Sequence, residues 1–154
     1  MSKNTHSKII ATNKRAFFDF AISEKMETGI VLEGCEVKSI RTGHITIKDA
    51  YVRVIQEELW LIGCHITPYK QASTVEAVDP ARNRKLLAHK KQICRLIEKT
   101  QEKGFTLIPL KLYFSKQRVK LEIGLGKSKK LYDKRKSIKD REIKRSLERL
   151  TKNY

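Results

Sequence analysis

The chain has 154 residues and a formal net charge of +17, with 34 Lys and Arg against 17 Asp and Glu. This length predicts one domain with an appended segment, and no apolar run approaches the roughly 20 residues of a membrane span. The N-terminus lacks the apolar stretch of a secretory signal. We therefore expect a soluble cytoplasmic protein with no membrane partner, whose positive charge favours a polyanion.

The first third of the chain alternates between short apolar runs and turn residues. Residues 9–11, 17–22 and 26–32 are typical of strands, with a bulge expected at Gly29. Residues 35–41 place two apolar side chains three apart and precede Gly43. This pattern predicts a short helix that ends in a glycine cap.

The middle of the chain predicts a hairpin and then an irregular loop. Residues 45–55 alternate in polarity, residues 56–58 are typical of a turn, and residues 59–66 read as a buried partner strand. Residues 67–80 contain two prolines and no periodicity. We expect that segment to be a mobile loop.

A long helix and a second hairpin are predicted next. Asp79 is suited to cap a helix that has Pro80 at its first position, and Lys103 and Gly104 are suited to end it. The apolar residues at helical spacing are Leu86, Leu87, Ile93, Leu96 and Ile97. Residues 105–114 and 118–125 then predict two strands joined by a turn at 115–117, with Tyr113 and Phe114 inside the fold.

The predicted fold is mainly β with flanking helices. About six strands and two or three helices favour an OB-like six-stranded β-barrel over residues 1–126, because the helices are too few to cover two faces of an open sheet. Residues 127–154 form a separate basic tail with 12 Lys or Arg against four Asp or Glu. We expect the tail to be disordered when free, although Ile143, Leu147 and Leu150 could line one side of a helix on a surface.

No combination of residues in the sequence predicts a catalytic or metal site. The three cysteines are odd in number and widely spaced, and no CxxC or HxxxH pair occurs, so we expect free thiols, no metal and no cofactor. Gly126-Lys127-Ser128 resembles the end of a phosphate-binding loop, but Leu121 stands where that loop needs glycine. An RNA-cleaving enzyme would have to use Glu33 or Glu36, which no histidine or metal set accompanies. We expect a binding protein and not an enzyme.

Basic residues on several predicted elements favour RNA as the polyanion. They comprise Lys38 and Arg41 on the short helix, Arg82, Arg84, Lys85, Lys90 and Lys91 on the long helix, and Lys111, Lys116, Arg118 and Lys120 on the second hairpin. Tyr132 in the tail is suited to stack on an unpaired base. Composition alone supports a general OB-type or ribosomal RNA-binding protein nearly as well as a specific one.

Seven ordered segments, spread from about Lys8 to the C-terminus, resemble the SsrA-binding protein (small protein B) family. They are residues 11–16 (ATNKRA), 29–32 (GIVL), 36–41 (EVKSIR), 79–80 (DP), 84–87 (RKLL), 111–113 (KLY) and 133–135 (DKR). The resemblance implies an OB-like barrel that binds the tRNA-like domain of transfer-messenger RNA. It also implies delivery of this RNA to stalled ribosomes together with elongation factor Tu.

The resemblance further implies a set of binding residues. On the barrel, the implied RNA contacts are Asn13, Glu27, Leu87 and Lys120, with support from Lys14, Arg15, Lys38, Arg41, Arg84, Lys85 and Lys111. Phe18 stands where the family often has a histidine that approaches RNA, and residues 43–46 (GHIT) depart from the usual Gly-Lys-Ala-Asn run, so their contacts stay open. In the tail, the residues expected to engage small-subunit rRNA near the decoding region are Lys129, Lys130, Tyr132, Asp133, Lys134 and Arg135.

Overall fold

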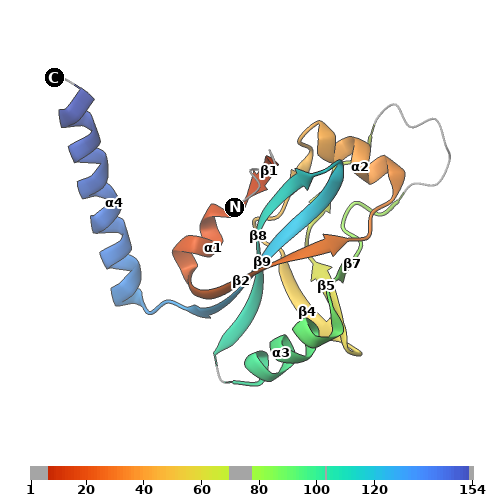
Figure 1. The fold of residues 1–154 in the computed structure, drawn as a ribbon. Helices are drawn as coiled ribbons and strands as arrows, with labels where there is room; N and C mark the ends of the chain where they lie inside the picture. The colour runs from red at the N-terminus through yellow and green to blue at the C-terminus, as the bar shows by residue number, and fades with distance from the viewer. Residues whose placement is uncertain (1–6, 70–77, 103, 153–154) are drawn as a thin grey trace.

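The computed structural model describes residues 7–69, 78–102 and 104–152 (Figure 1). In chain order the elements are β1 (Lys8–Thr12), α1 (Lys14–Asp19), β2 (Phe20–Ile30), α2 (Gly34–Arg41), β3 (Ile45–Thr46), β4 (Tyr51–Ile55), β5 (Glu58–Ile62), β6 (His65–Ile66), β7 (Arg84–Leu87), α3 (Lys90–Gln101), β8 (Phe105–Ser115), β9 (Arg118–Ser128) and α4 (Leu131–Lys152). Most of the predicted mobile loop lies outside the described residues.

Six strands pair into a closed ring. The order is β8-β4-β5-β7-β2-β9, and β9 pairs back onto β8. All of these pairings are antiparallel, β1 adds to the outside edge of β8, and β3 and β6 form a separate two-stranded ribbon. This arrangement confirms the mainly β class with flanking helices, and the ring contains six strands, the number expected of the barrel, although not all of them are the strands that were predicted (Figure 1).

Alternating side chains of the ring fill its interior. Leu59, Leu86, Leu107, Leu112 and Leu121 are all buried in one core cluster. The two hairpins turn at Gln56-Glu57 and at Lys116-Gln117, where all four residues have positive φ, the geometry of the tightest hairpin turns. The second predicted hairpin is therefore confirmed as β8 and β9. The predicted strand over residues 45–55 is instead interrupted between β3 and β4.

The prediction of two strands over residues 17–32 is wrong. The Asn13 side chain accepts a hydrogen bond from the Ala16 backbone N–H, and this cap starts α1 where a strand was expected. One strand, β2, then runs through to Ile30, with its irregularity between Ile22 and Glu24 and not at Gly29. By contrast, the short helix closed by Gly43 is confirmed as α2, and Gly43 has φ +80°.

The prediction of a long helix from Pro80 is also wrong. Residues Arg84–Leu87 form β7, which pairs with both β5 and β2, and the helix begins only at Lys90. Long-range pairing buries Leu86 in the barrel, and a capping box between His89 and Gln92 starts α3. The apolar residues that predicted one long helix therefore belong to two elements, β7 and α3.

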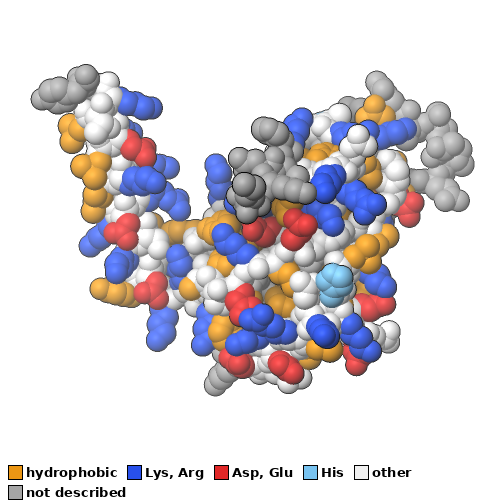
Figure 2. All heavy atoms as spheres, in the orientation of Figure 1, with side chains coloured by type: hydrophobic (Ala, Val, Ile, Leu, Met, Phe, Trp, Pro, Cys, Tyr) orange, Lys and Arg blue, Asp and Glu red, His pale blue; other side chains and the backbone are white. Residues whose placement is uncertain are grey.

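The C-terminal segment is a 22-residue helix in the structure, where we had expected disorder. Lys, Arg, Glu and Leu dominate its sequence and favour helix. α4 has no buried residue and projects from the barrel, with cationic and apolar side chains along its exposed surface (Figure 2). Because β9 continues to Ser128, Lys127 and Ser128 belong to the barrel and not to the tail. No helix in the described part of the chain combines the length and hydropathy that a bilayer span requires.

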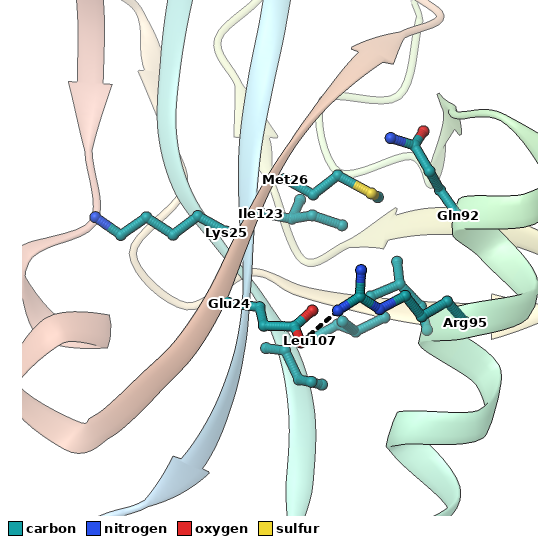
Figure 3. Close-up of a pocket in the computed structure, with 9 residues that line it drawn as sticks. Glu24, Lys25, Met26, Gln92, Arg95, Leu107 and Ile123 are labelled. Atoms are coloured by element: carbon teal, nitrogen blue, oxygen red, sulfur yellow. Dashed lines mark hydrogen bonds and ion pairs between the residues drawn. The ribbon is translucent and has the colours of Figure 1, made fainter.

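α3 covers one side of the barrel incompletely. A cavity of about 170 Å³ lies between α3 and strands β2, β8 and β9, with the apolar side chains of Met26, Leu96 and Ile123 among its walls (Figure 3). The Arg95 guanidinium pairs with the Glu24 carboxylate at 2.9 Å beside it. Both side chains are exposed, so this ion pair contributes little to stability.

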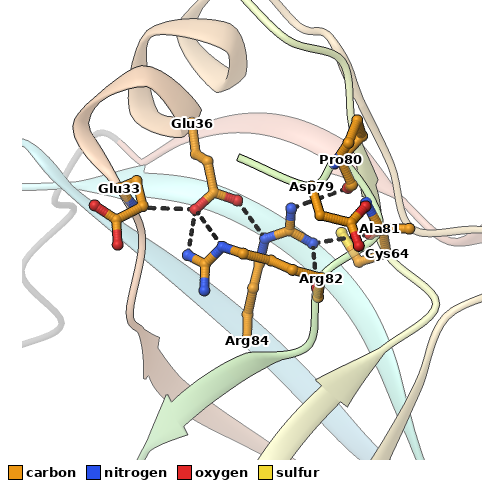
Figure 4. A network of polar contacts seen from close by, with 8 residues as sticks. All are labelled: Glu33, Glu36, Cys64, Asp79, Pro80, Ala81, Arg82 and Arg84. Atoms are coloured by element: carbon orange, nitrogen blue, oxygen red, sulfur yellow. Dashed lines mark hydrogen bonds and ion pairs between the residues drawn. The ribbon is translucent and has the colours of Figure 1, made fainter. Parts of the chain in front are cut away.

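A buried ion-pair network joins α2 to β7 (Figure 4). The Glu36 carboxylate accepts hydrogen bonds from the guanidinium groups of Arg82 and Arg84, with Arg84 Nε at 2.5 Å from Oε2. The Glu33 backbone N–H also donates to Glu36. Arg84 is completely buried and donates further to the carbonyl oxygens of Cys64, Arg82 and Pro80. Four of the five N–H groups of this guanidinium therefore donate within the protein, and each of its three nitrogens has an acceptor.

Glu36 contributes stability that depends on pH. Burial alone would raise the pKa of its carboxyl group, but the hydrogen bonds from Arg82, the Glu33 backbone and Arg84 together hold that pKa below its ordinary value of 4.5. A carboxyl group with a lowered pKa in the folded state stabilises the fold above its unfolded pKa. This contribution is lost as the pH falls below about 4.5.

We predict that Glu36→Gln destabilises the protein by roughly 3–5 kcal/mol, because it leaves the Arg84 charge buried without a partner. Denaturant unfolding at pH 7 measures this free energy. Glu58→Gln is the matched control, since Glu58 pairs with Lys85 at the surface and should cost no more than about 1 kcal/mol. An equal loss of unfolding free energy in the two variants would show that the buried ion pair stabilises the protein no more than the surface pair does.

Candidate nucleic-acid interface

One row of outward-facing residues crosses five strands. The register pairs Leu87 of β7 with Gly29 of β2, Gly29 with Lys120 of β9, Lys120 with Tyr113 of β8, and Tyr113 with Ile9 of β1. Residues paired in this way share one face of a sheet. Their neighbours along the strands, including Leu86, Thr28, Leu121 and Leu112, are buried, so the row lies on the outside.

A second row lies two residues further along β2, β8 and β9. It pairs Glu27 of β2 with Glu122 of β9, and Glu122 with Lys111 of β8, beside Thr12 of β1. We call the two rows together the sheet face. Four predicted RNA contacts therefore come together on it from four different strands: Glu27, Leu87, Lys111 and Lys120.

The sheet face combines exposed apolar groups with cations. Ile9 is 54% exposed and Leu87 is 52% exposed, which is unusual for side chains of this size within a sheet. A Cβ atom at Gly29 would lie only 3.1 Å from the Leu87 Cβ, so glycine allows Leu87 to lie close against β2. Apolar contact to a base or ribose next to Lys–phosphate pairing is the combination that single-stranded and looped RNA favours.

Glu27 is held in place by Tyr113. The Tyr113 hydroxyl donates a hydrogen bond to the Glu27 carboxylate across the intervening strand. Burial raises the pKa of the Tyr113 phenol above its ordinary value, and the hydrogen bond to Glu27 and the charges of Glu27 and Glu122 raise it further. The phenol therefore remains a donor at neutral pH and orients one oxygen of the Glu27 carboxylate.

α1 continues the sheet face at its far end. Lys25, which pairs with Gly124 on the same outer side of β2 and β9, places its ammonium group 5.3 Å from the centre of the Phe17 ring. Ala16 of α1 packs with Ile108 and Leu110 in a small cluster on this side. A Cβ at Gly124 would lie 2.8 Å from Leu110, so this glycine permits the close packing. Lys14 and Arg15 are exposed on α1, and the Arg15 guanidinium pairs with Asp49 at 3.3 Å.

Two predicted contacts, Asn13 and Arg84, lie in the interior, where their side chains are closed off from solvent. Asn13 is only 3% exposed, and its Nδ2 donates to the carbonyl oxygens of Pro109 at 3.1 Å and Ile47 at 3.3 Å. Its Oδ1 caps α1. Both residues therefore support the interface by fixing α1 and β7.

The remaining predicted residues lie on other elements. Lys38 and Arg41 are exposed on α2, with the Arg41 guanidinium 6.0 Å from the Phe114 ring, and Lys85 pairs with Glu58 at 2.7 Å. Phe18 of α1 is half-buried beneath Arg141 of α4, at 5.7 Å.

The predicted tail residues divide between α1 and solvent. Lys129 donates from Nζ to the Phe17 carbonyl oxygen, and Lys134 pairs with Asp19 at 3.4 Å. The other four are exposed: Lys130, Tyr132, Asp133 and Arg135.

Sequence reasoning missed Tyr113 and Ile9 as surface groups. We had placed Tyr113 inside the barrel, but the alternation along β8 puts Leu112 and Phe114 against the core and Tyr113 outside. The polar residues Lys111 and Ser115 on either side, at a spacing of two, were the signal that could have shown this.

We predict that Tyr113 stays protonated at pH 10, the ordinary pKa of tyrosine, and that Glu27→Gln lowers the Tyr113 pKa. NMR of the ring carbon that bears the hydroxyl, recorded through a pH series, measures this. Glu57→Gln in the exposed hairpin turn is the control and should leave the pKa unchanged. Since the neutral phenol is favoured, its contribution to stability is present below pH 10 and lost as the pH rises. Titration of Tyr113 at its ordinary pKa would contradict the assigned contact.

Sequence comparisons relate the chain to known proteins. The SmpB protein family matches residues 10–153. The SsrA-binding protein of Ralstonia nicotianae is 53% identical over 141 residues, which are 92% of this chain and 95% of the relative. The SsrA-binding protein of Thiobacillus denitrificans is 54% identical over 144 residues, or 94% and 97% of the two chains.

A solved structure supports the same assignment. The chain superposes with a TM-score of 0.66 and 42% identity on a chain from a study of tmRNA–SmpB at the centre of the bacterial ribosome. The match covers 80% of this chain and 85% of that one. With this fold, and with a sequence match over nearly its whole length, the chain belongs to the SmpB family of SsrA-binding proteins.

Proposed function

We propose that this protein binds the tRNA-like domain of transfer-messenger RNA through the sheet face and α1, and delivers it to stalled ribosomes. The observation that carries the proposal is that Glu27, Leu87, Lys111 and Lys120 lie on one surface, although Glu27 and Lys120 are 93 positions apart along the chain. The names of the relatives support this RNA as the partner.

Each group on the sheet face has a role suited to folded RNA. Lys111 and Lys120 neutralise phosphates, and the exposed Leu87 and Ile9 pack against bases or riboses. Glu27 cannot approach a phosphate favourably, so it accepts from a base amino group in the orientation that Tyr113 imposes. The protein acts by docking and orientation, and this function requires no bond to be made or broken.

α4 supplies the second contact of the proposed function. Its 22 residues span roughly 33 Å at 1.5 Å per residue, long enough to reach well beyond the barrel. Because it has no buried residue and presents its cations to solvent, it is suited to enter a channel lined by small-subunit rRNA near the decoding region. We place elongation factor Tu in the delivery complex and the protein in the cytoplasm, where ribosomes work.

The net charge of +17 also favours a second candidate, a general RNA-binding protein. Competition at physiological salt separates the two functions. The tRNA-like domain should displace a labelled copy of itself at concentrations at which an unrelated structured RNA of equal length does not. Equal displacement by the two RNAs would support the general binder.

We predict that Lys120→Ala weakens binding of the tRNA-like domain by about 3- to 10-fold and lowers the slope of log affinity against log salt by about one, because one phosphate contact is lost. Lys116→Ala is the control, since Lys116 lies in the hairpin turn beyond the sheet face. Filter binding across a salt series measures both. A larger effect at Lys116 than at Lys120 would show that the interface lies elsewhere.

We predict that a chain ending at Lys130 still binds the tRNA-like domain but fails in rescue, because it keeps the sheet face and loses α4. The cut falls after Lys130 because Lys127 and Ser128 pair with Ala21 and Phe20. A reconstituted translation reaction on a message without a stop codon measures peptide tagging. A chain ending at Lys152 is the control and should tag normally. Normal tagging by the shorter chain would show that rescue does not require α4.

A further inference from the structure

A groove lies between α3, β7 and the turn that joins β4 to β5, and Figure 1 shows α3 beside that turn. Its volume is about 400 Å³. Small-molecule sites in proteins usually measure roughly 300–1,000 Å³. Leu87 lines the groove and is also the exposed apolar residue of the sheet face, so the groove opens next to the surface on which we place the RNA. We call it the α3 groove.

The wall that α3 contributes is apolar in its middle and cationic at its start. Four residues of α3 line the groove at a spacing of i, i+3, i+4 and i+7, which places them on one helix face: Lys90, Ile93, Cys94 and Ile97. Ile93 and Ile97 are half-buried, whereas Lys90 and Cys94 are exposed. Together with Leu87 on the other side, the two isoleucines form an apolar slot with a cation at its end.

The charges at the rim can be exchanged for those of a ligand. Lys90 has no ion-pair partner within the part of the chain that the structure describes. Lys85 pairs with Glu58 at 2.7 Å, but their side chains are 40% and 43% exposed, so phosphate can replace this contact at little cost. Gln56 and Glu57 line the groove from the turn and carry acceptors suited to the amino groups of a base.

We propose that the α3 groove takes one unpaired nucleotide of the RNA that occupies the sheet face. Its base packs against Leu87, Ile93 and Ile97, and its flanking phosphates lie at Lys85 and Lys90. The nucleotide must be unpaired, because only a base splayed out of a helix can place its faces in such a slot. This inference rests on the proposed function, because the sheet face holds the rest of that RNA.

The continuity of the groove with the sheet face and the net charge of +17 favour RNA as the occupant over an apolar peptide. A peptide would use the isoleucines and leave Lys85 and Lys90 without a role. A nucleotide uses the apolar slot and both cations at once.

Cys94 reports directly on the groove in the wild-type protein. It is an exposed free thiol in the groove lining, whereas Cys64 is buried and Cys35 lies on α2. Alkylation by iodoacetamide, followed residue by residue with mass spectrometry, measures access to each thiol. A saturating amount of the tRNA-like domain should slow alkylation of Cys94 by at least about fivefold, because modification requires access to the thiol. An unchanged rate at Cys94 under saturation would overturn the proposal.

A variant that fills the groove tests whether a base enters it. Cys94→Trp should weaken binding of the tRNA-like domain by about tenfold, because the indole takes the place of the base. Cys94→Ser, which leaves the groove open, should bind like the wild type. Glu98→Trp is the matched control for bulk, since Glu98 is exposed on α3 and lies outside the groove lining. Thermal unfolding followed by circular dichroism checks that all three variants are folded.

Binding by Cys94→Trp that is no weaker than that of the wild type would overturn the proposal, as would an equal loss in Glu98→Trp. Failure of the proposed function gives a different result. The wild type would then bind the tRNA-like domain no better than an unrelated structured RNA, whereas slower alkylation of Cys94 with either RNA would still support the groove as a nucleotide site.

Discussion

Closure of the six-strand ring is the constraint on which the interface depends. β8 pairs with β1, β4 and β9, so it links the two edges of what would otherwise be an open sheet. A shift of one residue in the β2–β9 register would turn Lys120 and Glu122 inward and Leu121 outward. Burial of Leu121 and Ile123 opposes such a shift, and the same apolar packing that forms the core therefore positions Lys120 beside Leu87 and Tyr113.

Charge has two separate uses in this protein. The buried pair of Glu36 and Arg84 ties α2 to β7, and removal of either partner would leave a charge that water cannot reach. Most other cations lie at the surface, where ion pairs are weak and easily exchanged for phosphate. Lys134 and Asp19 are one such pair, at 3.4 Å.

Elements defined by local signals could be predicted from the sequence. The hairpin of β8 and β9 has clear alternation around a tight turn, and α2 has its glycine stop. β7 could not be predicted, because its four residues show helical spacing and become a strand only by pairing with β2 and β5. Residue type likewise did not reveal that Asn13 and Arg84 are buried. Glu27 and Leu87 came from family resemblance alone, whereas Lys120 also stood out among the basic residues of the predicted hairpin. Only the folded register brings such distant positions together.

The central claim is that the barrel binds RNA with the sheet face and α1 while α4 stays off that RNA. Hydrogen–deuterium exchange of the full chain, with and without the tRNA-like domain, tests it directly. The account predicts slower exchange in β7, β2, β9 and α1 on binding, and exchange in α4 that is unchanged or faster. Protection confined to α4, with the four barrel elements unaffected, would contradict it.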